Sequence, residues 1–335
     1  MKVLMLGGTG TISHAVAERC VAEGLDITIV TRGVSVHHPE PSGARVARGD
    51  VRGSEVVPSL LENEQFDVAI DFLAFTPDHI AQDIGWFRDR VGQYVFISSA
   101  SAYQTPPARL PVTESTPLRN PYWQYSRNKI ACEDALVAEY RATGFPVTIV
   151  RPSHTYDQTT VPCDGGWTVV ERMRQGKPVI VPGDGTSLWT LTHTADFARA
   201  FVPLLGRRDV LGEAFHITSD EAFTWNEIFR TLAAAAGVTA DLVPVPSALV
   251  SQYDEELGSA LLGDKANSIT FDNTKIRSIA RGWEAQIPFS RGAREIIAWH
   301  DADPARRRIE DRFDQLFDTL ANTAPHHNPG KPELT

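Results

Sequence analysis

One serine, one tyrosine and one lysine provide the first chemical signal in this sequence. Tyr125 and Lys129 are four positions apart in a segment with a helical pattern, so both side chains are expected on one helix face. An ammonium beside a phenol stabilises the phenolate, which is expected to lower a tyrosine pKa of about 10 towards neutrality. Ser99, at the end of an apolar run, can hydrogen-bond the same substrate oxygen. We therefore interpret these three residues as catalytic.

A glycine-rich turn near the start of the chain provides the second signal. The apolar run 2–6 leads into Gly7-Gly8-Thr9-Gly10-Thr11-Ile12-Ser13 and then into a helical pattern, the context in which such a turn binds a dinucleotide. Glycines let backbone N–H groups approach a pyrophosphate, and the helix N-terminus adds a favourable dipole. Ser13 replaces the third glycine of the usual pattern and is small enough for close packing. The residues of this turn predicted to bind the cofactor are Gly7, Gly10, Thr11 and Ile12.

The residues after the next three predicted strands extend this cofactor site. An acidic residue that would bind the ribose of NAD is missing after the second strand, where Thr31 and Arg32 stand instead. A guanidinium suits a 2′-phosphate, so NADP is favoured over NAD, with a solvated turn residue as the alternative role of Arg32. The other residues expected to contact the cofactor, the first two at the adenine, are Asp50, Val51, Phe72, Leu73 and Ala74.

The elements that must position these residues follow an alternating order typical of a doubly wound parallel sheet. Short apolar runs predict strands at 2–6, 26–31, 44–48, 67–72, 93–98 and 146–150. Amphipathic stretches between them predict helices at 11–23, 54–62, 78–90 and 122–143. The fold class is therefore expected to be α/β, with right-handed crossovers in a Rossmann-type sheet.

The pattern changes after residue 151. Strands are predicted at 178–181 and 214–217, with helices at 194–205, 224–236 and 290–301. We expect residues 1–150 to form an NAD(P)-binding domain to which some later segments return. Residues 151–321 are expected to form mainly a smaller C-terminal α/β substrate region, and 322–335 a disordered tail.

Composition excludes several classes of protein. The chain has 335 residues and a formal net charge of -10, which makes nucleic acid an unlikely partner. No apolar run approaches the roughly 20 residues of a membrane span, and three separated cysteines favour reduced thiols in the cytoplasm. We predict no metal site, because the histidine pairs at 37–38 and 326–327 lack partners at ligand spacing and are expected in solvated loops.

The ordered set of Gly7–Ser13, Ser99, Tyr125 and Lys129 resembles the extended short-chain dehydrogenase/reductase family, which includes UDP-galactose 4-epimerase. The chain is most similar to an atypical branch of NAD-dependent epimerase/dehydratases and chloroplast stem-loop RNA-binding proteins. The resemblance spans nearly all of residues 1–310. It implies a Rossmann domain with a small substrate domain, and a homodimer often formed through the helix that carries Tyr125. Further segments that carry the resemblance are 183–185, 193–196 and 271–275.

The resemblance also implies roles for individual side chains. Tyr125 would exchange a proton with a secondary alcohol or ketone of a sugar, nucleotide sugar or sugar-like small molecule while hydride moves to or from the nicotinamide. Lys129 would also hold the nicotinamide ribose, Ser99 would polarise the substrate oxygen, and Ser101 would contact substrate. The sequence leaves open whether the reaction is a net reduction, an epimerisation or a dehydration. The rival hypothesis is a non-catalytic nucleotide- or RNA-binding regulatory protein on the same fold.

Three departures from the family pattern bear on the substrate. Trp189 stands where relatives that bind nucleotide diphosphates carry an arginine, so a pyrophosphate loses a bidentate partner. His154 replaces a substrate-contacting asparagine, and residues 157–158 are Asp-Gln instead of Gly-Pro. Both Trp189 and His154 are predicted to contact substrate, with a structural hydrogen-bonded role as the alternative for His154. Aromatic residues left open between stacking on substrate and packing in a core are Tyr122, Trp123 and Trp167, and His193 is expected to fix a loop.

Overall fold

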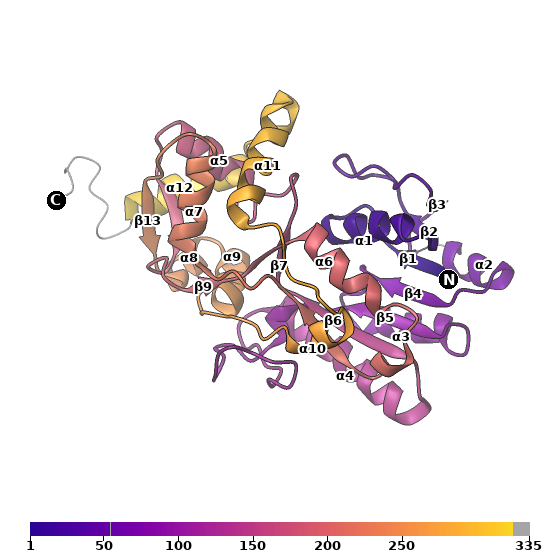
Figure 1. The fold of residues 1–335 in the computed structure, drawn as a ribbon. Helices are drawn as coiled ribbons and strands as arrows, with labels where there is room; N and C mark the ends of the chain where they lie inside the picture. The colour runs from indigo at the N-terminus through magenta and orange to yellow at the C-terminus, as the bar shows by residue number, and fades with distance from the viewer. Residues whose placement is uncertain (54, 324–335) are drawn as a thin grey trace.

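The centre of the molecule is a seven-stranded parallel sheet in the computed structural model, which describes residues 1–53 and 55–323 (Figure 1). The strand order is β11-β6-β5-β4-β1-β2-β3, so the chain winds outwards from β1 in both directions. This confirms the predicted Rossmann-type fold class. The strands are β1 (Lys2–Leu6), β2 (Asp26–Thr31), β3 (Arg45–Arg48), β4 (Val68–Asp71), β5 (Gln93–Ile97), β6 (Val147–Pro152) and β11 (Ala214–Ile217).

Helices cover both faces of the sheet because its buried strands carry apolar side chains on both sides. In β1, Val3 and Met5 pack into the core beneath α1 (Thr11–Ala22) and α6 (Thr194–Phe201). Leu4 and Leu6 pack on the opposite face. The helices on that second face are α2 (Val56–Asn63), α3 (Pro77–Phe87) and α4 (Gln124–Thr143).

Several predicted helices differ from the observed ones at an end, and for two of them the structure shows the cause. The helix expected from residue 122 begins at Gln124, because the side-chain oxygen of Asn120 accepts the backbone N–H groups of residues 122 and 123 and holds them in a turn. The helix expected over 194–205 is α6 only to Phe201. A 3-10 turn, Val202–Leu204, follows it where Pro203 cannot donate an α-helical hydrogen bond.

The chain returns to the sheet after building part of a second lobe. Strand β11 pairs with β6 in parallel register, with Phe215 beside Val150, and α10 (Thr274–Ile279) packs near it. The edge of the nucleotide-binding sheet is therefore made by residues far along the chain from its centre.

The second lobe has its own apolar core and lies at the left in Figure 1. Its strands form three short pairs: β8 (Val179–Pro182) with β13 (Leu242–Val245), β9 (Leu188–Trp189) with β12 (Phe223–Thr224), and β7 (His154–Tyr156) with β10 (Leu191–His193). Its helices are α5 (Trp167–Arg174), α7 (Trp225–Ala235), α8 (Ser247–Tyr253), α9 (Glu255–Ala260), α11 (Phe289–Asp301) and α12 (Asp311–Thr323). Single turns lie at Ala100–Ala102, Arg208–Val210, Leu261–Lys265 and Pro304–Arg306.

Several predictions about the chain as a whole can be compared with this architecture. Residues 322–323 end α12, and the rest of the predicted tail, with its two histidines, lies outside the described residues. In the described ranges no helix is both long and apolar enough to cross a membrane. The three cysteines, Cys20, Cys132 and Cys163, are buried and free of disulfides.

Candidate active site

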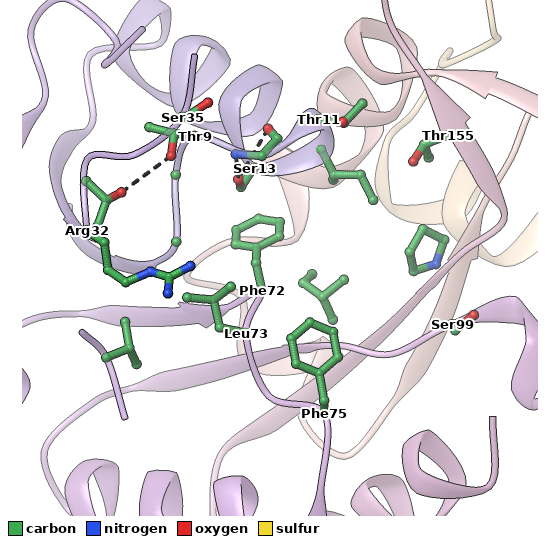
Figure 2. Close-up of a pocket in the computed structure, with 18 of the residues that line it drawn as sticks. Thr9, Thr11, Ser13, Arg32, Ser35, Phe72, Leu73, Phe75, Ser99 and Thr155 are labelled. Atoms are coloured by element: carbon green, nitrogen blue, oxygen red, sulfur yellow. Dashed lines mark hydrogen bonds between the residues drawn. The ribbon is translucent and has the colours of Figure 1, made fainter. Parts of the chain in front are cut away.

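A cavity of about 740 Å³ lies along the carboxyl ends of the central strands. Figure 2 shows Phe72, Leu73 and Phe75 on one side of it and the first turn of α1 on the other. Arg32 lies at one end and Ser99 at the opposite end. Its lining contains every residue predicted to contact the cofactor except Ala74: Gly7, Gly10, Thr11, Ile12, Thr31, Arg32, Asp50, Val51, Phe72, Leu73, Tyr125 and Lys129.

The glycine-rich turn brings its backbone against the core, as a dinucleotide site requires. A side chain at Gly8 would place its Cβ only 2.4 Å from Cγ2 of Ile29 on β2, so the close approach of turn and strand needs glycine there. The first-turn N–H groups of α1 have no acceptor within the helix and face the cavity end where a pyrophosphate would sit. Ser13 is buried, and its Oγ accepts the Gly10 N–H at 2.9 Å. These residues fit a bound dinucleotide.

At the adenosine end the exposed Arg32 follows the buried Thr31. The Thr31 hydroxyl accepts the N–H of Gly33 at 3.2 Å and thereby fixes the turn after β2. Within the described part of the chain, the Arg32 guanidinium forms no ion pair with a carboxylate, so it is available to an anionic ligand. Asp50 lies opposite, where its hydrogen bond from the Arg52 backbone lowers the pKa of its carboxyl group.

Sequence analysis missed a buried ionic cluster beneath the adenosine end. The guanidinium of Arg52 bridges Asp71 and Asp83, at 2.5 Å from the Asp83 carboxylate, and the Tyr94 hydroxyl donates to Asp83 at 2.6 Å. Burial, aided by Asp71, raises the pKa of Asp83 well above its ordinary value. Asp71 also accepts the N–H of Leu73, so the cluster fixes the turn that lines the cavity.

This turn corrects one predicted contact. Ala74 is buried in the core beneath the sheet and does not line the cavity, whereas Phe75 does. The carbonyl oxygen of Ala74 instead accepts a hydrogen bond from Nζ of Lys129 at 2.7 Å. Its contribution is therefore to position the lysine, through the backbone.

Tyr125 and Lys129 lie together at the other end of the cavity, with the lysine Nζ 5.8 Å from the centre of the tyrosine ring. The Lys129 ammonium also donates to the carbonyl oxygen of Ile97 at 2.8 Å. Burial lowers the pKa of Lys129 to about 8. Burial also raises the pKa of Tyr125 to about 12, against the opposing effect of a hydrogen bond with Ser99. The expected lowering of the tyrosine pKa is wrong, because desolvation of the phenolate outweighs the stabilisation available here.

Helix α4 is anchored to the sheet by a residue that the motif search did not single out. Glu133 lies one helical turn beyond Lys129, on the same face. Its carboxylate accepts from the Ser98 hydroxyl at 2.5 Å and pairs with the Arg151 guanidinium at 2.6 Å. All three side chains are buried. The carboxyl ends of β5 and β6 are thereby tied to the helix that carries Tyr125.

A smaller cavity of about 230 Å³ opens beside Tyr125. It brings together all four residues that the sequence predicted for substrate contact, namely Ser99, Ser101, His154 and Trp189. Sequence analysis gave no signal for Asp264 and Lys265, which lie more than a hundred residues further along. The remaining lining residues are Ala100, Trp123, Tyr125, Ser153, Ile269 and Phe271.

The structure shows where the residues lie for which the sequence allowed two roles. Burial lowers the pKa of His154 to about 4, so its imidazole is neutral near pH 7. Trp123 lies beside Tyr125, with ring centres 4.8 Å apart, while Trp167 stacks on His300 in the second core. Tyr122 is exposed. As predicted, His193 fixes a loop: its Nδ1 accepts the N–H of Ala195 at the start of α6.

The loop after β2 closes over the cofactor cavity and contacts the second lobe. His38, predicted to be solvated, is buried, and its Nε2 lies 2.6 Å from a carboxylate oxygen of Asp157. A second link to the same segment comes from the first turn of α1, where the hydroxyls of Thr11 and Thr160 lie 3.3 Å apart. Asp157 stands where the resemblance predicts glycine, so this departure from the family pattern creates the partner that buries His38.

Comparison with known proteins identifies the family. Residues 3–218 match the model of the NAD dependent epimerase/dehydratase family. The chain belongs to that family. This confirms the resemblance seen in the sequence, and it makes the chain an enzyme that uses a nicotinamide dinucleotide.

The relatives of this epimerase/dehydratase chain differ in activity. The chloroplast stem-loop binding protein of 41 kDa b of Arabidopsis thaliana is 27% identical over 70% of this chain and 63% of its own length. The 2′-dehydrokanamycin reductase of Streptomyces kanamyceticus is 25% identical over 76% of this chain and 72% of its own. The UDP-glucose 4-epimerase of Lactobacillus helveticus is 23% identical over 91% of this chain and 98% of its own length.

Solved structures of other epimerases and dehydratases share the fold. The epimerase Mth375 of Methanothermobacter thermautotrophicus superposes with a TM-score of 0.75 at 17% identity, over 92% of this chain and 94% of that one. The dTDP-glucose 4,6-dehydratase of Bacillus anthracis, solved in complex with NAD, superposes with a TM-score of 0.70 at 18% identity, over 91% of this chain and 98% of that one. These similarities establish the fold. The chemistry of the site depends on this chain's own residues.

Proposed function

We propose that this enzyme oxidises, reduces or epimerises a secondary alcohol or ketone of a sugar or sugar-like substrate, with Tyr125, Lys129 and Ser99 as its catalytic residues. One observation carries the proposal: the large cavity and the small cavity are both lined by Ser99 and Tyr125. A dinucleotide in the first and a substrate in the second would therefore meet at the phenol. Their shared wall is completed by Ser153 and His154.

The protonation state of each catalytic group fits a role in this reaction. With a pKa of about 12, Tyr125 keeps its proton at neutral pH and can donate it to a ketone oxygen that gains negative charge. Lys129 has three N–H donors, two of which are used by the carbonyl oxygens of Ala74 and Ile97. The third is free to hold a ribose hydroxyl. The nicotinamide, when bound, supplies or accepts the hydride.

The proposed cofactor preference is NADP over NAD. Arg32 at the adenosine end is exposed, lines the cavity and is preceded by a neutral threonine. A 2′-phosphate would gain a charge-assisted hydrogen bond there, while no acidic side chain at this position would bind the two ribose hydroxyls of NAD.

Replacing the catalytic phenol tests the proposal. Each of a panel of sugars would be mixed with enzyme and NADP, and formation of reduced nicotinamide measured. Tyr125→Phe should lose about 10²- to 10⁴-fold in rate on any sugar that the enzyme oxidises, with unchanged dinucleotide affinity. Tyr122→Phe, at an exposed neighbour, should behave as wild type. Full activity of Tyr125→Phe would refute the assignment.

A second candidate follows from one of the relatives. The Arabidopsis relative is named as a stem-loop binding protein, so a non-catalytic RNA-binding role is the alternative. A net charge of -10 opposes it. Salt-dependent RNA binding at physiological ionic strength, with no nucleotide-dependent redox activity, would establish this alternative in place of catalysis.

Two further predictions concern the assembly and location of the enzyme. We propose a homodimer through α4, to be tested by light scattering with wild type and a charged substitution at the exposed Tyr140 on that helix. A cytoplasmic location also stays a prediction, to be tested by fractionation of the cells that produce the protein.

A further inference from the structure

The charges that line the small cavity are unusual for a site that would hold a nucleotide diphosphate. Among the described residues, Asp264 and Lys265 are its charged lining groups, and no arginine lines it. Nζ of Lys265 lies 3.4 Å from the carboxylate of Asp164, which already compensates its charge. Trp189 occupies the position at which the family resemblance predicts a guanidinium. A pyrophosphate would therefore meet a carboxylate whose charge Lys265 offsets only in part, and no cation among the described lining residues that lacks a carboxylate partner.

The local structure of Asp264 leaves its carboxylate able to bind a ligand. It lies in a single π-helical turn, Leu261–Lys265, a conformation that is frequent at functional sites. Its side chain is half-buried, and no side chain or backbone N–H in the described ranges donates a hydrogen bond to it. Burial raises the pKa of its carboxyl group to about 7, which shows how poorly the protein alone solvates the negative charge.

The π-helical turn is held directly against the catalytic segment. The Asn120 side chain donates to the carbonyl oxygen of Gly263 at 2.6 Å, and the same asparagine donates to the carbonyl oxygen of Ser101 at 2.9 Å. A Cβ on Gly263 would lie 2.7 Å from Cβ of Trp123, so only glycine permits this approach. The contact brings Asp264 within electrostatic range of Tyr125, because its charge contributes to raising the tyrosine pKa.

The other walls of the cavity also suit a compact cation. Trp123, Trp189 and Phe271 line it, and aromatic faces attract ammonium groups. The indole N–H of Trp189 is buried and has no hydrogen-bond partner among the described residues. The cavity thus offers one carboxylate and aromatic walls beside the catalytic phenol.

We propose that the small cavity binds an amino sugar that is not esterified to a nucleotide, with its ammonium group paired to Asp264 and its reacting carbon beside Tyr125. This inference rests on the proposed function for the position of the reacting carbon. The paired ammonium would supply the charge compensation that Asp264 lacks in the protein alone, and it would select against phosphorylated substrates by repulsion.

Binding measurements that need no turnover test this proposal. The Tyr125→Phe enzyme, saturated with NADP, would be titrated by calorimetry with D-glucosamine, D-glucose and UDP. Glucosamine should bind at least about 10-fold more tightly than glucose, the effect of one charge-assisted hydrogen bond. UDP should bind more weakly than glucosamine.

Variants of the carboxylate sharpen the test. Asp264→Asn should remove the preference for glucosamine over glucose and leave NADP affinity unchanged. Asp184→Asn, in an exposed loop of the same lobe, should keep the preference. Equal binding of the two sugars by the Tyr125→Phe enzyme, no measurable glucosamine binding, or tighter binding of UDP would each overturn the proposal, whether or not Asp264→Asn folds. Failure of the proposed function would appear separately, as turnover retained by Tyr125→Phe.

Discussion

The two cavities that meet at Tyr125 are built in different ways. The phosphate side of the larger one comes from a single turn of the chain, Gly7–Ser13, whose neighbours in sequence are neighbours in space. The smaller one is lined by residues spread between Ser99 and Phe271. The turn needs only a strand and a helix to take its shape, whereas the small cavity exists only when both lobes have packed. The phosphate side of the larger cavity is therefore a local property, and the small cavity is a property of the whole fold.

The largest effect is expected where helix α4, which carries Tyr125 between the two cavities, is connected to the sheet. Glu133→Ala leaves the guanidinium of Arg151 buried without its partner, so unfolding should become about 3–5 kcal/mol easier, measured by urea denaturation. Glu139→Ala, at a partly exposed ion pair with Arg88 on the same helix, should cost no more than about 1 kcal/mol. Equal losses of unfolding free energy in the two variants would show that the buried ion pair stabilises the fold no more than the partly exposed one.

A change at the adenosine end should affect the larger cavity alone. Arg32→Gln should weaken NADP binding about 10- to 100-fold and NAD binding by less than about 2-fold, because only NADP has the 2′-phosphate. Fluorescence titration with each dinucleotide measures both constants. Arg48→Gln, at an arginine that already pairs with Glu40, should leave the ratio of the two constants unchanged. Parallel weakening of NADP and NAD would contradict the proposed preference.

The contact between the loop after β2 and the second lobe couples the two regions. His38→Ala removes the link to Asp157 but keeps the one between Thr11 and Thr160. We expect the dinucleotide to dissociate several-fold faster, as expected for one lost hydrogen bond, in stopped-flow fluorescence. Val36→Ala, at an exposed position in the same loop, provides the control. An unchanged dissociation rate would show that the loop does not retain the cofactor.

The smallest expected effect concerns the pH dependence of turnover. The charge of Asp264 raises the pKa of Tyr125, so Asp264→Asn should lower that pKa by less than about one unit. Alcohol oxidation requires the phenolate, which forms as pH rises through this pKa. The rise of kcat/KM with pH should therefore move to lower pH in the variant. A shift to higher pH would mean that Asp264 does not act on the phenol through its charge.

The residues proposed for catalysis and cofactor binding could be singled out from sequence because each lies at a fixed offset from a strand or helix end. Tyr125 and Lys129 are one helical turn apart, and both face the cavity as that spacing required. The pKa of Tyr125 could not be inferred in the same way. It depends on how completely the folded chain removes water from the phenol, and the i, i+4 rule says nothing about that.

The misplaced residues share one physical cause. His38 was expected in solvent because its own segment has no apolar pattern, yet Asp157 from the other lobe buries it. Ala74 was expected to line the cavity, but the turn held by Asp71 points it into the core. In both cases a hydrogen bond that no local apolar pattern predicts decides the direction of the side chain. For His38 the partner is distant in sequence, and for Ala74 the bond lies within a short turn.

The amino-acid sequence alone determined the parallel sheet, the glycine-rich turn and the serine, tyrosine and lysine of the site, because hydrophobic periodicity and short-range spacing are local properties of a chain. Only the tertiary structure decided that Asp264 and Tyr125 line the same small cavity and that, among the described residues, its lysine is already paired with a carboxylate. Those features arise when segments more than a hundred residues apart are packed together and shielded from water. Their charges then act on one another through a medium of lower dielectric constant than the solvent in which the unfolded chain keeps them apart.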